Sequence, residues 1–293
     1  MSLADARTEA KRALAEKTLG KVKPKFLAYA EARDGYLKHV EGKNRASTYA
    51  GYKSRLSRID WGRSNLADIT PRDVLSKLKA FDEVPMEKRY AFVVLRSFFN
   101  WCVAEHHLDS SPMDKLSAPQ KSDRRERVLT TDELNAIWNA ATDDGFGHTV
   151  KVLMLTGQRR GEVQHITLEG DVANIPGAHT KNKRAHAFPV PVSASKLLSP
   201  APKWVGWGKS KAALYKASKV ANWTLHDLRR TYSTNLAALK VPPHIIEALL
   251  NHKTGVISGV AATYNRFLYL DEMRKAVAAY ERWITPYLAA KVS

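Results

Sequence analysis

The chain has 293 residues, which is enough for two domains that each bury a hydrophobic core. Hydrophobic residues make up 44% of it and charged residues 26%, values that are typical of a folded soluble protein and exclude an intrinsically disordered one. The 47 lysines and arginines outnumber the 29 aspartates and glutamates, and the net charge of +18 is spread along the chain. Such a charge favours a polyanionic partner, above all nucleic acid, although an acidic protein or an anionic membrane surface would also attract it.

Membrane insertion and secretion are not expected, since no apolar run approaches the length of a membrane span and no charged-then-apolar leader opens the chain. The single cysteine, Cys102, excludes an internal disulfide and fits the reducing conditions of the cytoplasm. Because Cys102 adjoins an apolar helical stripe, we expect a buried thiol rather than a nucleophile.

The first part of the chain, to about Leu116, has a helical pattern. Residues 3–21 are expected to form one helix that ends at the glycine cap Gly20. Further helices are expected behind Asn44, behind the cap Thr70 with its following proline, and after Pro85. In the last of these helices, apolar residues recur at steps of three and four and define the face that packs inward: Phe92, Leu95, Phe99 and Val103.

The second part begins after the basic stretch KSDRRERV, residues 121–128, where we expect a domain boundary. Thr130 and Glu133 have the spacing of a capping box, so a helix should run from there to about Ala141. Residues 165–192 consist of short alternating runs separated by Gly, Asn and Pro, which predict a small antiparallel sheet of two or three strands. Helical patterns then return. The expected fold class is therefore mainly α with a small antiparallel β-sheet (α+β).

Five short polar motifs follow one another in this part, and each is a weak signal when taken alone. LTGQRRGEV, residues 155–163, joins a glycine turn to two arginines but lacks the spacing of a phosphate loop. Lys181 lies in the expected hairpin, and the helical motif HDLR, residues 226–229, places its histidine and its arginine on one face. His252 follows an apolar helix end, and Tyr264 stands between polar neighbours. Their order along the chain is more specific than any one of them.

In that order of arginine, lysine, His-x-x-Arg, histidine and tyrosine, the sequence resembles the tyrosine recombinase family, which includes the phage and prophage integrases. The resemblance runs from about residue 125 to the end and rests on TGQRRGE at 156–162, TKN at 180–182, HDLR at 226–229, LNH at 250–252 and Tyr264. Two positions depart from the family pattern. Asn251 stands where the family usually has glycine, and Arg266 stands where many members have histidine after the nucleophile.

The resemblance implies a set of catalytic residues: Arg159, Lys181, His226, Arg229, His252 and Tyr264. Tyr264 would attack a DNA phosphodiester, forming a link to the 3′ phosphate and releasing a 5′ hydroxyl. This covalent intermediate conserves the energy of the broken bond, so no ATP is required. The two arginines would stabilise the negative charge of the transition state, because planar guanidinium groups suit phosphate oxygens.

The remaining roles follow from the same resemblance. His226 would act as the base toward the tyrosine phenol, or the phosphate itself would accept that proton. Lys181 would protonate the leaving alkoxide, and His252 would hydrogen-bond a phosphate oxygen. Glu162 would not contact the phosphate itself but would orient the arginine or the base.

The resemblance also implies a domain organisation and partners. Residues 1–23 would be a helical remnant of an arm-binding domain or a linker, 24–118 a core-binding domain, 119–128 a basic linker and 129–293 the catalytic domain. Candidate DNA contacts in the core-binding domain are Arg45, Ser47, Thr48, Lys53 and Arg55. Double-stranded DNA is the expected partner, bound by a homotetramer in the synaptic complex, with a DNA-bending protein and an excisionase as further candidates.

No cofactor or metal is expected, because the ten histidines are scattered and no carboxylate pair accompanies the motifs. Four histidines are interpreted as surface groups rather than metal ligands: His106, His107, His179 and His186. The final helix has apolar residues at helical spacing: Met273, Val277, Tyr280 and Ile284. This spacing predicts that the helix packs against its own domain. The resemblance implies a second possibility, that the helix docks on a neighbouring subunit.

Two other functions remain open at this point. A type IB topoisomerase shares the nucleophile, two arginines, lysine and histidine, and would relax supercoils without a specific site. A DNA-binding regulator with a degenerate site would bind without cleaving, although the intact set of motif residues argues against it.

Overall fold

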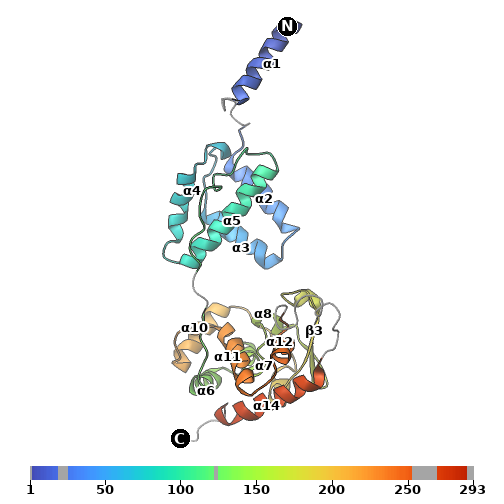
Figure 1. Cartoon of the computed structure of the whole chain (residues 1–293). Coiled ribbons are helices and arrows are strands. Elements are labelled where there is room, and N and C mark those ends of the chain that lie inside the picture. The colour runs from blue at the N-terminus through green and yellow to red at the C-terminus, as the bar shows by residue number, and fades with distance from the viewer. Residues whose placement is uncertain (1, 19–25, 122–124, 253–268, 289–293) are drawn as a thin grey trace. The chain divides into compact units, whose positions relative to one another are not determined.

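The structure is a computed structural model that describes residues 2–18, 26–121, 125–252 and 269–288. The chain divides into two compact units, Met1–Arg124 and Arg125–Ser293 (Figure 1). Each unit has its own buried hydrophobic cluster.

The first unit is helical in all its described regular elements. Its helices are α1 (Leu3–Thr18), α2 (Tyr29–Glu41), α3 (Ala46–Arg58), α4 (Pro71–Leu78) and α5 (Pro85–Ala104), with short 3₁₀ turns at Leu66–Asp68 and Lys79–Phe81. The predicted helix behind Asn44 begins at Ala46, with Arg45 rather than Asn44 in the N-cap position.

Helix α5 supplies more buried residues to the first core than any other described element. Tyr29 and Tyr36 of α2 both pack edge-on against Phe98, at ring-centroid distances of 5.5 and 5.6 Å. Cys102 is fully buried beside them, which confirms the expectation of a core thiol, and burial raises its pKa to about 12. Because the thiolate is the reactive form, this cysteine is chemically inert at neutral pH.

The second unit combines helices with one small sheet. Its elements are α6 (Thr131–Ala140), α7 (Gly145–Thr156), α8 (Arg160–Val163), β1 (Thr167–Glu169), β2 (Val172–Ile175), a 3₁₀ turn (Gly177–His179), β3 (His186–Pro189), α9 (Val192–Leu197), α10 (Trp207–Ser218), α11 (Leu225–Ala238), α12 (Pro243–Leu249) and α14 (Leu270–Leu288). The strands are antiparallel in the order β1-β2-β3, with Ala173 opposite both Leu168 and Phe188. The expected fold class, mainly α with a small antiparallel sheet, is confirmed.

Capping boxes define where three helices start. Thr70 with Asp73 caps α4 and Thr130 with Glu133 caps α6, at caps that the sequence predicts. Thr224 with Asp227 caps α11 in the same way. Each pair satisfies backbone N–H groups that have no partner within their own helix. The last of these helices carries two of the motif residues, so its start position sets where they lie.

Helix α14 packs within the second unit. Its predicted apolar stripe is buried, with Met273, Val277, Tyr280 and Ile284 each at most 5% exposed. The Tyr280 hydroxyl donates a hydrogen bond to the Met154 carbonyl of α7 at 3.1 Å. This confirms that the final helix belongs to the core of its own unit.

Candidate active site

Residues from three of the described motifs meet around the last turn of α12. A helix leaves its final carbonyl groups without partners inside the helix, and here side chains from three other segments donate to them. Leu249, Leu250 and Asn251 each have a carbonyl oxygen bound in this way. The negative end of the helix thereby collects cationic side chains in one place.

Arg229 is the most deeply held of these cations. It lies on α11, is 4% exposed, and donates from Nη1 to the Gly157 carbonyl at 2.9 Å and from Nη2 to the Leu250 carbonyl at 2.5 Å. Burial first, and the positive charge of Arg159 second, lower the pKa of Arg229, while Glu162 opposes the shift. Its two short bonds to carbonyl oxygens keep the guanidinium charged and fixed in orientation.

Gly157 makes this arrangement possible. It ends α7 in the left-handed conformation, at φ +63°, and a Cβ at this position would lie 2.5 Å from Cδ1 of Tyr232. Glycine is therefore required both for the turn and for the close approach of α11. The turn directs the Gly157 carbonyl toward Arg229 and starts the segment that carries Arg159.

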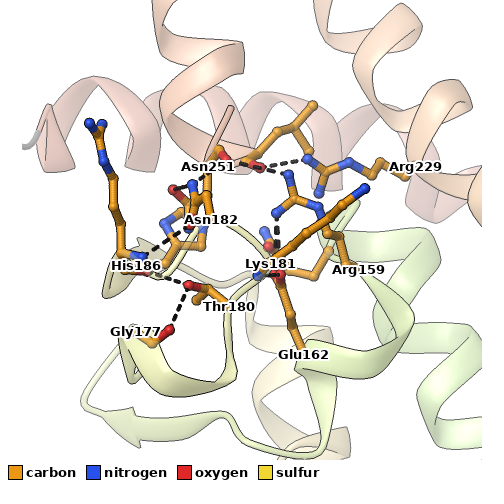
Figure 2. Close-up of polar contacts among 12 residues, drawn as sticks. Arg159, Glu162, Gly177, Thr180, Lys181, Asn182, His186, Arg229 and Asn251 are labelled. Atoms are coloured by element: carbon orange, nitrogen blue, oxygen red, sulfur yellow. Dashed lines mark hydrogen bonds and ion pairs between the residues drawn. The ribbon is translucent and has the colours of Figure 1, made fainter. Parts of the chain in front are cut away.

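Arg159 lies at the N-cap position of α8 and connects two other motifs. Its Nη1 is 3.3 Å from Oε1 of Glu162, and its Nη2 donates to the Asn251 carbonyl at 3.4 Å. Glu162 is 3% exposed, and the same Oε1 accepts the backbone N–H of Lys181 at 2.9 Å. In Figure 2 the carboxylate of Glu162 lies between Arg159 and the turn that contains Lys181.

Lys181 itself is exposed and sits in the turn between β2 and β3, as expected from the sequence. The turn is closed by the fully buried Thr180, whose hydroxyl is 2.7 Å from the Arg184 carbonyl and 3.1 Å from the Gly177 carbonyl. Because Thr180 is buried and hydrogen-bonded, it fixes the backbone of the neighbouring Lys181, whose side chain lies at the surface.

The next residue, Asn182, bonds directly to the turn after α12. Its Nδ2 donates to Oδ1 of Asn251 at 2.8 Å and lies 3.1 Å from the Asn251 carbonyl, as Figure 2 shows. Asn251 adopts the left-handed conformation at φ +49°. Asparagine is among the few residues other than glycine that tolerate this conformation, so the departure from the family's glycine is compatible with the turn.

His226 occupies the first turn of α11, next to the buried capping residue Asp227. The Asp227 carboxylate accepts the Thr224 backbone N–H at 2.8 Å and forms ion pairs with Arg125 at 2.7 Å and Arg230 at 2.8 Å. Partial burial, and then the positive charges of Arg229 and Arg230, lower the pKa of His226. At neutral pH the imidazole is therefore uncharged and able to accept a proton.

His252 is the last described residue before position 269. Its backbone N–H donates to the Glu247 carbonyl at 3.0 Å, and its side chain is exposed. Partial desolvation, followed by the charges of Arg229, Arg159 and His226, lowers its pKa. Tyr264 and Arg266 lie outside the described residues, so their predicted positions are not addressed by the structure.

Two buried residues of the site were not identified as site residues from the sequence. Gln158 donates from Nε2 to the Leu249 carbonyl at 2.9 Å, and Nε2 of His186 lies 3.0 Å from the same oxygen. The interpretation of His186 as a surface group is wrong: it is 6% exposed, stacks on Phe188, and burial lowers its pKa to about 4. The alternation of β3 could have revealed this, because His186 shares a strand face with the buried Phe188.

The other three histidines are less buried. His106 and His179 are exposed, as expected, and His179 stacks on His165 at 3.8 Å between ring centroids. His107 is half-buried and packs edge-on against Trp101 at 5.4 Å.

A cavity of about 370 Å³ opens beside His226 and Arg159. None of the described residues that line it is acidic: Gln158, Arg159, Arg160, Gly161, Lys211, Thr224, Leu225 and His226. The guanidinium of Arg160 lies 4.8 Å from the ring of Trp207, which holds it in place. The site is thus a cationic hollow suited to a phosphate diester.

The candidate DNA contacts of the first unit lie at the start and along the length of α3. Arg45, Ser47, Thr48 and Lys53 are exposed. Arg55 differs from them: it pairs with Glu87 at 2.9 Å, lies over the ring of Tyr90 and has a side chain only 20% exposed. These contacts favour a packing role for Arg55.

Two kinds of feature are absent from the described parts of the chain. Within them, histidine, cysteine and carboxylate side chains nowhere gather in threes in a way that could hold a metal ion. Likewise, none of the helices described is both long and apolar enough to span a bilayer.

Solved structures of integrases share this fold. Lambda integrase, residues 75–356, in a dimer bound to a COC′ core site is 19% identical, with a TM-score of 0.65 over 80% of this chain and 98% of that one. Lambda integrase in a tetramer bound to a Holliday junction gives 19% identity and a TM-score of 0.65 over 88% and 90%. The Tn1549 transposon integrase, residues 82–397, in complex with circular intermediate DNA gives 15% identity and 0.56 over 85% and 98%.

No protein-family model matches the sequence, and no curated protein sequence does so either. The structural likenesses nevertheless establish that the chain has the fold of tyrosine recombinases. They confirm, at the level of fold, the resemblance found in the sequence motifs.

Proposed function

We propose that the chain is a site-specific DNA recombinase of the tyrosine recombinase type, which integrates and excises a mobile element such as a prophage. The observation that carries the proposal is the convergence of Arg159, Arg229 and the Lys181 turn on the end of α12. His226 lies on the same helix as Arg229, three residues before it. These residues come from segments far apart in the sequence, and their types are those needed for strand transfer at a phosphate.

The proposed reaction begins with attack of the Tyr264 phenol oxygen on a DNA phosphorus. A phenol has a pKa near 10, so it must lose its proton as it attacks. The neutral imidazole of His226 is the candidate acceptor. The product is a 3′-phosphotyrosine link, which a 5′ hydroxyl can later attack to rejoin the strand without ATP or a metal.

Arg159 and Arg229 would meet the negative charge that builds up on the non-bridging phosphate oxygens. Both are already oriented by carbonyl groups, so little reorganisation is needed when the phosphate arrives. His252 would hydrogen-bond the same phosphate. Lys181 would give a proton to the leaving 5′ oxygen, which is too basic to depart as an alkoxide.

The first unit would act as the core-binding domain, and the net charge of +18 would hold duplex DNA across both units. By analogy with the lambda integrase tetramer on a Holliday junction, the active assembly would be a homotetramer on DNA. A DNA-bending protein and an excisionase are the further partners that this function calls for, and the bacterial cytoplasm, at the nucleoid, is the corresponding location.

The test is covalent capture of DNA. A nicked suicide substrate with the element's attachment sequence is incubated with the protein in EDTA and without ATP, then run on a denaturing gel beside Tyr264→Phe. We expect a covalent band that the variant loses. A band that persists in Tyr264→Phe would place the nucleophile elsewhere, and DNA binding without any band on cognate sites would favour a regulator. Relaxation of supercoiled DNA that lacks the site would favour a type IB topoisomerase.

A further inference from the structure

The turn after α12 contains one residue of a pair that has no role in the proposed reaction. Asn251 has φ +49°, a conformation in which glycine would be the unstrained choice. Asparagine is one of the few residues with a side chain that tolerate this conformation, and at this position its amide also has a partner. That partner is Asn182, 69 positions away in sequence.

The two amides form a reciprocal contact. Nδ2 of Asn182 donates to Oδ1 of Asn251 at 2.8 Å, and Nδ2 of Asn251 lies 3.4 Å from Oδ1 of Asn182. Nδ2 of Asn182 also lies 3.1 Å from the Asn251 carbonyl, and Oδ1 of Asn182 accepts the backbone N–H of Arg184 at 3.2 Å. Both residues are half-buried, so these bonds are only partly exposed to competition from water. We call this pair the amide clasp.

The amide clasp connects the groups that must act together. Asn182 directly follows Lys181, and Asn251 directly precedes His252. The Asn251 carbonyl is shared, since it also accepts from Nη2 of Arg159 at 3.4 Å. A single pair therefore links the lysine turn, the histidine turn and a phosphate-binding arginine (Figure 2).

We propose that Asn182 is a positioning residue that, through the amide clasp, holds Lys181 where it can protonate the leaving 5′ oxygen. The inference rests on the proposed recombinase function. In the step concerned, the Tyr264 oxygen forms a bond to phosphorus and the phosphorus–O5′ bond breaks. The ammonium of Lys181 gives one proton to O5′, and the phenol proton passes to His226. No oxidant or reductant is involved, and the charges balance.

Proton delivery is sensitive to position. A lysine turn without the clasp would sample more conformations, and misplacement of a reacting group by about 1 Å can cost on the order of a hundredfold in rate. We therefore expect Asn182→Ala to slow strand cleavage by about 10- to 100-fold. DNA affinity should change little, because a neutral amide adds no phosphate charge neutralisation.

A sulfur substitution at the leaving group separates this role from a purely structural one. When the 5′ bridging oxygen is replaced by sulfur, the leaving group is a thiolate, which is a far weaker base than an alkoxide and needs no proton donor. Single-turnover cleavage is measured with oxygen and sulfur suicide substrates for the wild type, Asn182→Ala and Lys181→Ala. We expect both variants to be slow on oxygen and to recover to near the wild-type rate on sulfur.

Two further variants sharpen the test. Asn251→Gly keeps the left-handed turn and the carbonyl but removes the reciprocal amide, so it should show the same pattern more weakly. Asn174→Ala, at a half-buried asparagine on β2 of the same sheet, is the matched control and should cleave both substrates normally. Thermal unfolding checks that each variant is folded.

The outcomes are distinct. Equal loss on oxygen and sulfur substrates by a folded Asn182→Ala would overturn the positioning role, and so would no loss on either. If Asn174→Ala is also slow on the oxygen substrate and recovers on the sulfur substrate, the effect is not specific to the amide clasp and the proposal is overturned. If the wild type forms no covalent complex at all while it binds the DNA, the proposed recombinase function fails, and this result is recognisable before any variant is tested.

Discussion

The buried carboxylate of Glu162 accepts the backbone N–H of Lys181 at 2.9 Å while it faces the Arg159 guanidinium at 3.3 Å. The Glu162 side chain thus holds both the backbone of Lys181, the proposed proton donor, and the guanidinium of Arg159, a proposed phosphate ligand. The resemblance to the recombinase family had left open whether this glutamate orients the arginine or the base. Its hydrogen bonds favour the arginine and the lysine turn.

The two functions of Glu162 can be separated by substitution. Glu162→Gln retains an oxygen for the Lys181 N–H but loses the charge, whereas Glu162→Ala loses both. We expect the glutamine variant to cleave about tenfold more slowly and the alanine variant about a hundredfold, because alanine also leaves a buried donor unsatisfied. The alanine change should lower the free energy of unfolding by about 1–3 kcal/mol. Single-turnover cleavage and calorimetry measure the two effects, and equal, near wild-type rates would remove Glu162 from the site.

Arg159 is expected to matter through the transition state rather than through DNA binding. Loss of an arginine that meets developing phosphoryl charge costs on the order of a thousandfold in other phosphoryl transfers, and we expect a comparable loss for Arg159→Ala. Arg159→Lys keeps the charge but not the fork that reaches both Glu162 and Asn251, so it should lie between the alanine variant and the wild type. Gel-shift affinity should remain within a few-fold of wild type. Cleavage at the normal rate by the alanine variant would show that this arginine does not contact the phosphate.

The sequence predicted the local structure well at positions where the backbone geometry requires a particular residue type, such as a helix cap or a left-handed turn. The helix caps at Thr70 and Thr130 and the glycine turn at Gly157 lie where they were expected. Hydrophobic periodicity likewise predicted the packing of the final helix.

The interactions that link the motifs could not be predicted, because they are long-range. The contact between Asn182 and Asn251 joins residues far apart in sequence, and no local pattern specifies it. The same holds for the carbonyl groups at the end of α12, whose partners come from α8, β3 and α11 or the turns beside them. The surface position expected for His186 is wrong because the alternation of β3 directs its side chain to the buried face that also holds Phe188.

Gly157 offers a prediction about stability. In Gly157→Ala the residue would keep φ +63° only with strain, and its Cβ would overlap the ring of Tyr232 at 2.5 Å. We expect the second unit to lose at least about 2–3 kcal/mol of unfolding free energy from strain and overpacking. Cleavage should also fall, since Arg229 donates to the Gly157 carbonyl.

The matched control for this change is Gly161→Ala. Gly161 lies in α8, and nothing would lie within 4 Å of an added Cβ. Its unfolding temperature should therefore stay within about 2 °C of wild type, since surface changes without contacts are usually within about 0.5 kcal/mol. A Gly157→Ala protein as stable as Gly161→Ala would contradict the requirement for glycine at the end of α7.

The buried His186 gives a pH dependence with a definite sign. Its pKa is about 4 in the folded chain, whereas the ordinary value is 6.5. The unfolded chain therefore binds a proton between these values while the folded chain does not, and stability falls as the pH is lowered through that window. The contribution of the uncharged His186 to the free energy of unfolding is fully present above about pH 6.5. The difference between the two pKa values corresponds to about 3 kcal/mol of this free energy.

The measurement is hydrogen exchange of the α7 amides, corrected for the intrinsic rate, at pH 7 and pH 5. His186→Gln can still donate to the Leu249 carbonyl but does not titrate, so we expect its protection to fall less at pH 5 than that of the wild type. His106→Asn, at an exposed position with φ +58°, should behave like the wild type. If wild type and His186→Gln lose the same protection between the two pH values, the acid sensitivity of this unit comes from groups other than His186.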